Sequence, residues 1–177
     1  SNLVGNAPLE QAMQVEFDKL GPVMFDNEDA AFADEIRKTL TADDIAASFQ
    51  RAGRETPPDL PLCDFVAPLE RPSIGGEGST DVGDVSWVTP TVQARVATCA
   101  VGTPFHTWQT VAQGKAPAAH KGMIHAAKVM AATATHLINS PETLQAAREI
   151  HDQRQNATPY VCPIPSGQKP PVIEQPS

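Results

Sequence analysis

The stretch that decides the fold is TVQARVATCAVG, which runs from Thr91 to Gly102. Apolar and polar residues alternate from Val92 to Val96, and the residues that follow are apolar on both faces. Period-two alternation is typical of a β-strand with one solvent-facing side, and a doubly apolar end is typical of a buried strand. We therefore expect a strand that is half exposed at first and buried at its end, with Cys99 inside it.

Helical patterns lie on both sides of this strand. Apolar residues recur at helical spacing over residues 8–20, 27–40 and 118–139, and capping residues predict two further helices, one starting near Thr41 and one running from Ser140 to about Gln153. Asp26 or Asn27 is the expected N-cap of the second helix. Helices around a strand indicate an α/β fold. One strand makes no sheet, so either further strands lie within residues 79–92 or part of the fold is missing.

Proline and glycine mark the irregular segments. The chain has 17 prolines, many of them around residues 57–72 and after Pro159. Residues 52–78 lose all periodicity and are expected to form a long loop, which in a compact domain is usually functional or disordered. We expect one ordered segment over 1–157, with 52–78 as its loop, and a Pro-rich tail over 158–177.

The overall composition narrows the function classes. The net charge of -8 argues against a nucleic-acid partner, which needs clustered Lys and Arg. No apolar run approaches the ~20 residues of a membrane span, and the start has no signal-peptide layout. Three widely spaced cysteines without a CxxC pair indicate reduced thiols. We therefore expect a cytoplasmic protein that binds neither membrane nor nucleic acid.

His106 is the first candidate site residue, in the run GTPFHTWQ directly after the apolar end of the expected strand. Ligands gather at the carboxyl ends of strands in α/β sheets. An imidazole there can bind a metal, move a proton or hold its own loop by hydrogen bonds. Spacing alone favours the structural alternative, because no second histidine is near in sequence.

The second candidate is the run STDVGD, Ser79 to Asp84. Two carboxylates three residues apart, between Gly78 and Gly83, can converge on a cation, an arginine or a substrate amine. The alternative is a solvated turn, in which Asp and Gly are common. His120 and His125 do not have the i, i+4 spacing of HExxH zinc sites and are not candidates on this pattern.

Three ordered motifs carry a family resemblance: GSTDVGDVSWVTPT, GTPFHTWQ and AHKGMIHAAKVMA. Together they resemble the aminoacylase and carboxypeptidase-type metal-dependent amidohydrolases, and within these the group that forms the larger part of p-aminobenzoyl-glutamate hydrolases. The opening VGNAPLEQAM and the closing TPYVCPIP are similar to that group as well. The resemblance thus covers nearly the whole chain.

The resemblance implies that residues 1–157 are the C-terminal half of a three-layer α/β/α catalytic domain, without its lid domain. Such a domain binds two divalent metal ions, zinc, manganese or cobalt. His106 matches a metal ligand of the family, and the loop of Gly78, Ser79, Thr80 and Asp81 matches a segment that lines the substrate site. The other ligands and the general-base glutamate belong to the N-terminal half, so no catalytic base is assigned here.

The implied activity is metal-assisted hydrolysis of the amide bond in N-acyl or N-aroyl amino acids or small peptides, with p-aminobenzoyl-glutamate as the favoured substrate type. The chain alone is expected to be inactive, and on its own to lack a full set of metal ligands. Its expected partners are the missing N-terminal half and a second copy or partner subunit. The alternative is a folding or assembly subunit that contributes only an interface.

Overall fold

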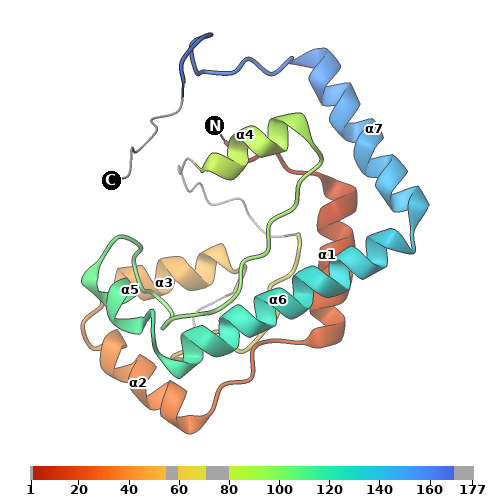
Figure 1. Ribbon diagram of the computed structural model, residues 1–177. Coiled ribbons are helices and arrows are strands. Elements are labelled where there is room, and N and C mark those ends of the chain that lie inside the picture. The colour runs from red at the N-terminus through yellow and green to blue at the C-terminus, as the bar shows by residue number, and fades with distance from the viewer. Residues whose placement is uncertain (1, 55–59, 71–79, 170–177) are drawn as a thin grey trace, which may run out of the picture.

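The computed structural model describes residues 2–54, 60–70 and 80–169, and over these ranges it contains helices and no strand. Figure 1 shows the helices arranged around irregular connections. Their bounds are α1 Ala7–Leu20, α2 Asn27–Arg37, α3 Ala42–Arg51, α4 Asp81–Val88, α5 Trp108–Gln113, α6 Pro117–Ile138 and α7 Pro141–Ala157.

The predicted strand at Thr91–Gly102 is wrong, and with it the expected α/β fold with three α/β/α layers. The segment passes between α4 and α5 without regular secondary structure. A β-strand requires backbone hydrogen bonds to a neighbouring strand. Among the described residues, Ala100 N–H donates to the side chain of Gln113, Val101 N–H donates to the carbonyl of Pro61, and no strand lies alongside. The alternation matches the exposure of these residues in part, but it has no partner strand.

Two short helices occupy segments for which we predicted loops or strands. α4 begins after Thr80, whose hydroxyl accepts from Val82 N–H at 3.3 Å. α5 begins after Thr107, whose hydroxyl accepts from Thr110 N–H at 3.5 Å. The alternative that strands are hidden in 79–92 is therefore also wrong for its described part. Both helices are too short to show a full apolar stripe in the sequence.

The five longer helices confirm the helical patterns. Asp26 caps α2 and Thr41 caps α3, each in a reciprocal capping box with the residue three positions on. Ser140 precedes α7 as expected, but its side chain makes no capping hydrogen bond, so that detail is wrong. Gly21 ends α1 with φ 72°, a left-handed conformation that glycine adopts without strain.

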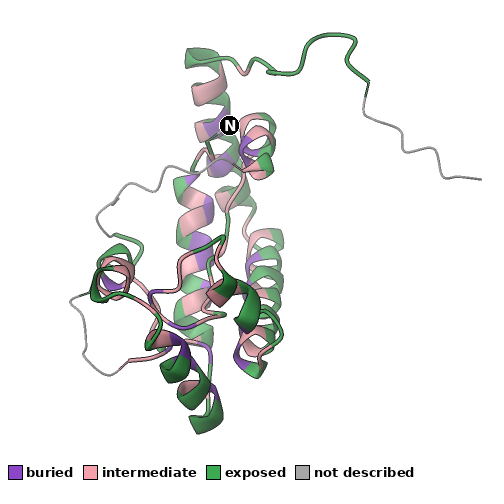
Figure 2. Cartoon of the chain, turned by 90° about the vertical axis from the view of Figure 1, so that its left-hand side faces the viewer, coloured by how far each residue is buried: buried purple, intermediate pink, exposed green. Residues whose placement is uncertain are grey.

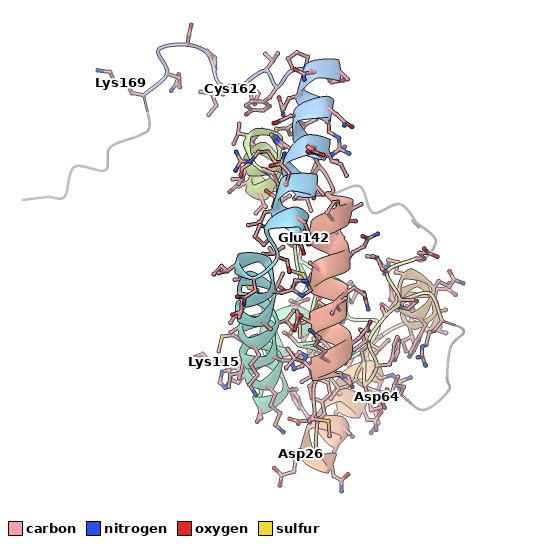
Figure 3. All side chains as sticks on the ribbon, turned by 90° about the vertical axis from the view of Figure 1, so that its right-hand side faces the viewer. Asp26, Asp64, Lys115, Glu142, Cys162 and Lys169 are labelled. Atoms are coloured by element: carbon pink, nitrogen blue, oxygen red, sulfur yellow. The ribbon has the colours of Figure 1, made fainter. Side chains whose placement is uncertain are left out.

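α1 is the helix that holds the two longest helices together. It packs against α6 and α7, and Figures 1 and 3 both show it beside α6. Glu16 of α1 lies 2.7 Å from Nδ1 of His136 on α6. The Asn6 side-chain amide, at the start of α1, donates to the Ala147 carbonyl of α7 at 2.9 Å. Hydrogen bonds with Lys19 and then His136 lower the pKa of the Glu16 carboxyl.

A second set of charged groups ties α6 to the start of α2. Lys121 forms ion pairs with Asp26, at 2.6 Å, and with Asp29, whose side chain is almost fully buried. The hydrogen bond from Lys121 lowers the pKa of Asp26 to about 2, and the same two carboxylates raise the pKa of Lys121. α6 is therefore fixed at its beginning by α2 and near its end by α1.

The apolar core is small and lies under the first turns of α6. Its members come from α2, the 60–70 segment, the 91–102 segment and α6: Ala33, Ile36, Leu62, Ala100 and Ala118. Gly122 of α6 faces the backbone of Ala97 so closely that a Cβ would overlap the Ala97 carbonyl oxygen. Figure 2 shows buried residues on the inward sides of the helices and exposed residues over their outer sides. No helix within the described ranges is long and apolar enough to cross a membrane.

The cysteines and the tail complete the fold. Cys63 and Cys99 are partly buried and Cys162 is exposed, and all three are free thiols. The prediction for Cys99 is therefore wrong, because this residue lies in no strand and is only partly buried. After α7 the chain continues without helix to residue 169, and the Tyr160 hydroxyl donates to Asp84 of α4 at 3.0 Å. The division between residues 1–157 and the 158–177 tail stays a prediction, as does the 52–78 loop, of which only part is described.

Candidate functional site

The loop that carries His106 is built around one buried glutamine. The Gln113 side-chain carbonyl accepts from Ala100 N–H at 2.7 Å, and its amide donates to the Thr103 hydroxyl at 3.1 Å. The same amide also donates to the carbonyl of Gln109. Gln113 thus connects the start of the loop to α5, and its 3% exposure means that water cannot replace these bonds.

Further hydrogen bonds close the loop on itself. The hydroxyls of Thr107 and Thr110 both donate to the Pro104 carbonyl, each at 2.7 Å. Gly102, with φ 95°, lets the chain turn where it touches α3, because a Cβ there would meet the backbone of Ile45 at 2.9 Å. The loop from residue 100 to residue 107 is therefore a defined support and not a free surface segment.

His106 stands at the outside of this support. Its φ of 62° is the only positive value at a non-glycine residue in the described part of the chain. Its side chain is exposed and makes no hydrogen bond with other described residues. A left-handed conformation at such a residue costs free energy, and residues of this kind cluster at functional sites. Phe105 and Trp108 beside it are exposed as well, so they form no packed wall around the imidazole.

The second predicted group lies elsewhere. Thr80 caps α4 and Asp81 is its first, exposed residue, whereas Gly78 and Ser79 lie outside the described residues. Figure 1 shows α4 at the top of the molecule, near the start of α7, and α5 at the left beside α3. The structure of this chain therefore does not bring Thr80 and Asp81 together with His106, and their assignment to a substrate site stays a prediction.

The other histidines do not complete a metal centre with His106. His136 is bound to Glu16, His120 is exposed, and the buried Nε2 atoms of His125 and His151 have no hydrogen-bond partner. No group of three or more His, Cys, Asp or Glu side chains in the described ranges is arranged to hold a metal ion. The described residues therefore offer His106 as a single free donor and do not fit a whole metal site.

The largest cavity, about 440 Å³, lies away from all predicted site residues. It separates α1 from the 63–69 and 91–97 segments, and His125, whose Nε2 is buried, is among its lining residues. Met13, Phe17 and Phe65 give it apolar walls, and Arg95 stands among its polar lining residues. The sequence did not predict this cavity, because its lining comes from segments far apart in the chain.

Comparison with known proteins gives a curated relative from Escherichia coli (strain K12), the subunit of p-aminobenzoyl-glutamate hydrolase designated B. The chain is 40% identical to it over 184 aligned residues, and the match covers 96% of this chain. The chain is a relative of this hydrolase subunit. This confirms the resemblance inferred from the three motifs. No family model and no solved structure matches the chain.

The match also has a clear limit in length. The chain spans 37% of the length of the E. coli relative, so more than half of that protein has no counterpart here. A single free histidine on a rigid loop is compatible with a site whose other ligands lie in the unmatched part. The comparison does not test the roles assigned to His106, Thr80 or Asp81.

Proposed function

We propose that this chain is part of a metal-dependent amidohydrolase of the cytoplasm that cleaves the amide bond of N-acyl or N-aroyl amino acids similar to p-aminobenzoyl-glutamate. The observation that carries the proposal is the 40% identity to a hydrolase subunit across 96% of the chain. The geometry of His106 supports it, because a strained, exposed imidazole on a fixed loop is available to a ligand.

In the proposal, His106 supplies one nitrogen ligand of a site that binds divalent zinc, manganese or cobalt. The remaining ligands and the general base come from outside the described residues. What this chain contributes is position. Gln113, Thr107 and Thr110 fix the loop, so the imidazole is held at one place before the rest of the site meets it.

The decisive experiment compares two histidine variants in the complete, longer protein. His106→Ala is expected to lower kcat/KM for p-aminobenzoyl-glutamate roughly 100-fold or more and to reduce bound metal, measured by mass spectrometry. His120→Ala is the matched control, because His120 is also exposed and without a partner in the described structure. Equal activity and metal content in both variants would contradict the role of His106.

A second measurement addresses the chain alone. The 177-residue chain is assayed with p-aminobenzoyl-glutamate and added zinc, manganese or cobalt. We expect no turnover, because the described residues contain no complete metal site. Turnover close to that of the complete protein would show that the essential groups are all present here.

The second candidate function is a folding or assembly subunit that contributes only an interface. The observation in its favour is the amount of apolar surface on the outer side of α6, where Met123 and Met130 are both more than half exposed. The two functions differ at His106. In an assembly subunit, His106→Ala leaves the metal content and activity of the assembled enzyme unchanged.

A further inference from the structure

The outer face of α6 is apolar along nearly the whole helix. Its exposed residues recur every three or four positions, which places them on one side of the helix. We call this set the α6 stripe: Met123, Ala127, Met130, Ala131, Ala134 and Ile138. Exposed fractions of 61% for Met123, 59% for Met130 and 76% for Ile138 show that nothing in the described structure covers it.

The opposite side of α6 already has its partners. Ala118, Gly122, Val129 and Thr133 are buried, and they follow the same helical spacing. Figure 3 shows α6 at the edge of the molecule, with α1 on one side of it only. A helix that is apolar on both sides is normally buried on both. The α6 stripe is therefore a second packing surface and not the back of a surface helix.

The composition of the stripe indicates what covers it. Three alanines let a partner backbone approach closely, and the flexible methionines fill the gaps between side chains. α6 contains no Asp or Glu, and at its edges Lys128 and His120 are exposed and unpaired in the described structure. Two α6 helices placed face to face would bring these cationic edges together with no carboxylate of their own to balance them. A partner with an apolar face and acidic edges fits the stripe better than a second copy.

We propose that the α6 stripe is the surface on which the rest of the longer protein packs, through an apolar element edged by Asp or Glu. The length of the relative supports this occupant, since the match leaves more than half of that protein outside. The inference shares with the proposed function the premise of a longer protein, but it requires neither metal binding nor hydrolysis.

The methionines of the chain provide the test, because oxidation by hydrogen peroxide depends on exposure. Met123, Met130 and Met24 are exposed, at 61%, 59% and 81%, and Met13 is buried at 6%. The probe is a separate chain that corresponds to the unmatched part of the relative, mixed with the 177-residue chain. We expect it to slow oxidation of Met123 and Met130 about tenfold while Met24 stays reactive and Met13 stays protected.

A pair of variants gives an independent measurement. Met130→Glu places a carboxylate in the α6 stripe and is expected to weaken binding of the probe chain about tenfold or more. Met24→Glu is the matched control, since Met24 is the same residue type and more exposed, but lies between α1 and α2. Both positions are exposed, so circular dichroism is expected to show unchanged folding.

Several results would overturn the inference. These are no binding of the probe chain, binding that leaves Met123 and Met130 as reactive as before, or equal binding by the two variants. Protection that rises with the concentration of the chain alone overturns it in favour of a second copy, and protection by vesicles of anionic phospholipid overturns it in favour of a membrane. Protection by the probe chain without hydrolysis would support the α6 stripe while counting against the proposed activity, so the two proposals fail separately.

Discussion

His106 combines strain with exposure, and the strain has a measurable consequence. At φ 62° a residue with a Cβ is less stable than glycine, which adopts this conformation freely. We expect His106→Gly to be more stable to urea unfolding than His106→Ala by about 1 kcal/mol, because both lack the imidazole and differ in strain. Equal stability of the two variants would show that the loop does not hold residue 106 in the left-handed conformation.

Gln113 is the residue on which the His106 loop depends. Gln113→Leu removes the acceptor of the Ala100 N–H and leaves that buried group unpaired, which is expected to cost about 1–3 kcal/mol of unfolding free energy. Gln109→Leu, in the same helix, is the control. The Gln109 side chain makes only a long, exposed contact of 3.5 Å to Thr39, so its removal is expected to change stability little. Urea unfolding measures both, and a similar loss in the two variants would contradict the role of Gln113.

The sequence predicted the candidate residues of this region but not their support. Motif resemblance singled out His106, because the run GTPFHTWQ is contiguous. Gln113 was missed, since its contacts with Ala100 and Thr103 are set by tertiary structure and a lone glutamine has no pattern. The positive φ of His106 was equally hidden, because no neighbouring glycine or asparagine marks a turn at that position.

Among the helices, α6 depends on a single glycine for its position. A Cβ at Gly122 would overlap the backbone carbonyl of Ala97, which cannot move aside as a flexible side chain can. We expect Gly122→Ala to lower the free energy of unfolding by about 2 kcal/mol. Gly114→Ala is the control, because a Cβ there lies 3.5 Å from the nearest atom and the backbone is helical. Urea titration of both variants measures the difference, and equal stabilities would rule out the close packing.

Prediction of the elements succeeded where the pattern was long and capped. α1, α2, α3, α6 and α7 all have a capping residue or a first-turn proline in the sequence. α4 and α5 are short, so their sequences show too few turns to reveal a stripe. The segment from Thr91 to Gly102 has the composition of a strand, but alternation describes a chain's faces and cannot supply the neighbour that makes a sheet.

Across the whole molecule, α6 is held by two sets of charges that weaken in acid. Glu16 and Asp26 both have lowered pKa values, Asp26 at about 2. A carboxyl whose pKa is lower in the folded state contributes stability above its ordinary pKa, and this is lost as the pH falls through the folded value. We therefore expect Tm to be steady near neutral pH and to fall between about pH 4 and 2.

The contribution of the α2 contact to this profile can be isolated with two lysine variants. Lys121→Met removes the partner of Asp26 and Asp29, so Tm is expected to be lower at neutral pH and to depend less on acid. Lys128→Met is the control, because Lys128 is in the same helix and exposed without a partner in the described structure. Differential scanning calorimetry across the acid range measures both. Identical profiles for the two variants would show that the ion pairs with α2 do not hold α6.

The three thiols give this chain a natural position for chemical labelling. Burial raises the pKa values of Cys63 and Cys99, which keeps them in the less reactive thiol form at neutral pH. Cys162 is exposed in the segment that follows α7. A maleimide dye at low excess will therefore attach first near the C-terminal tail without any cysteine being replaced. Paired with the native tryptophans, such a dye makes the separation of tail and body observable by energy transfer in the unaltered sequence.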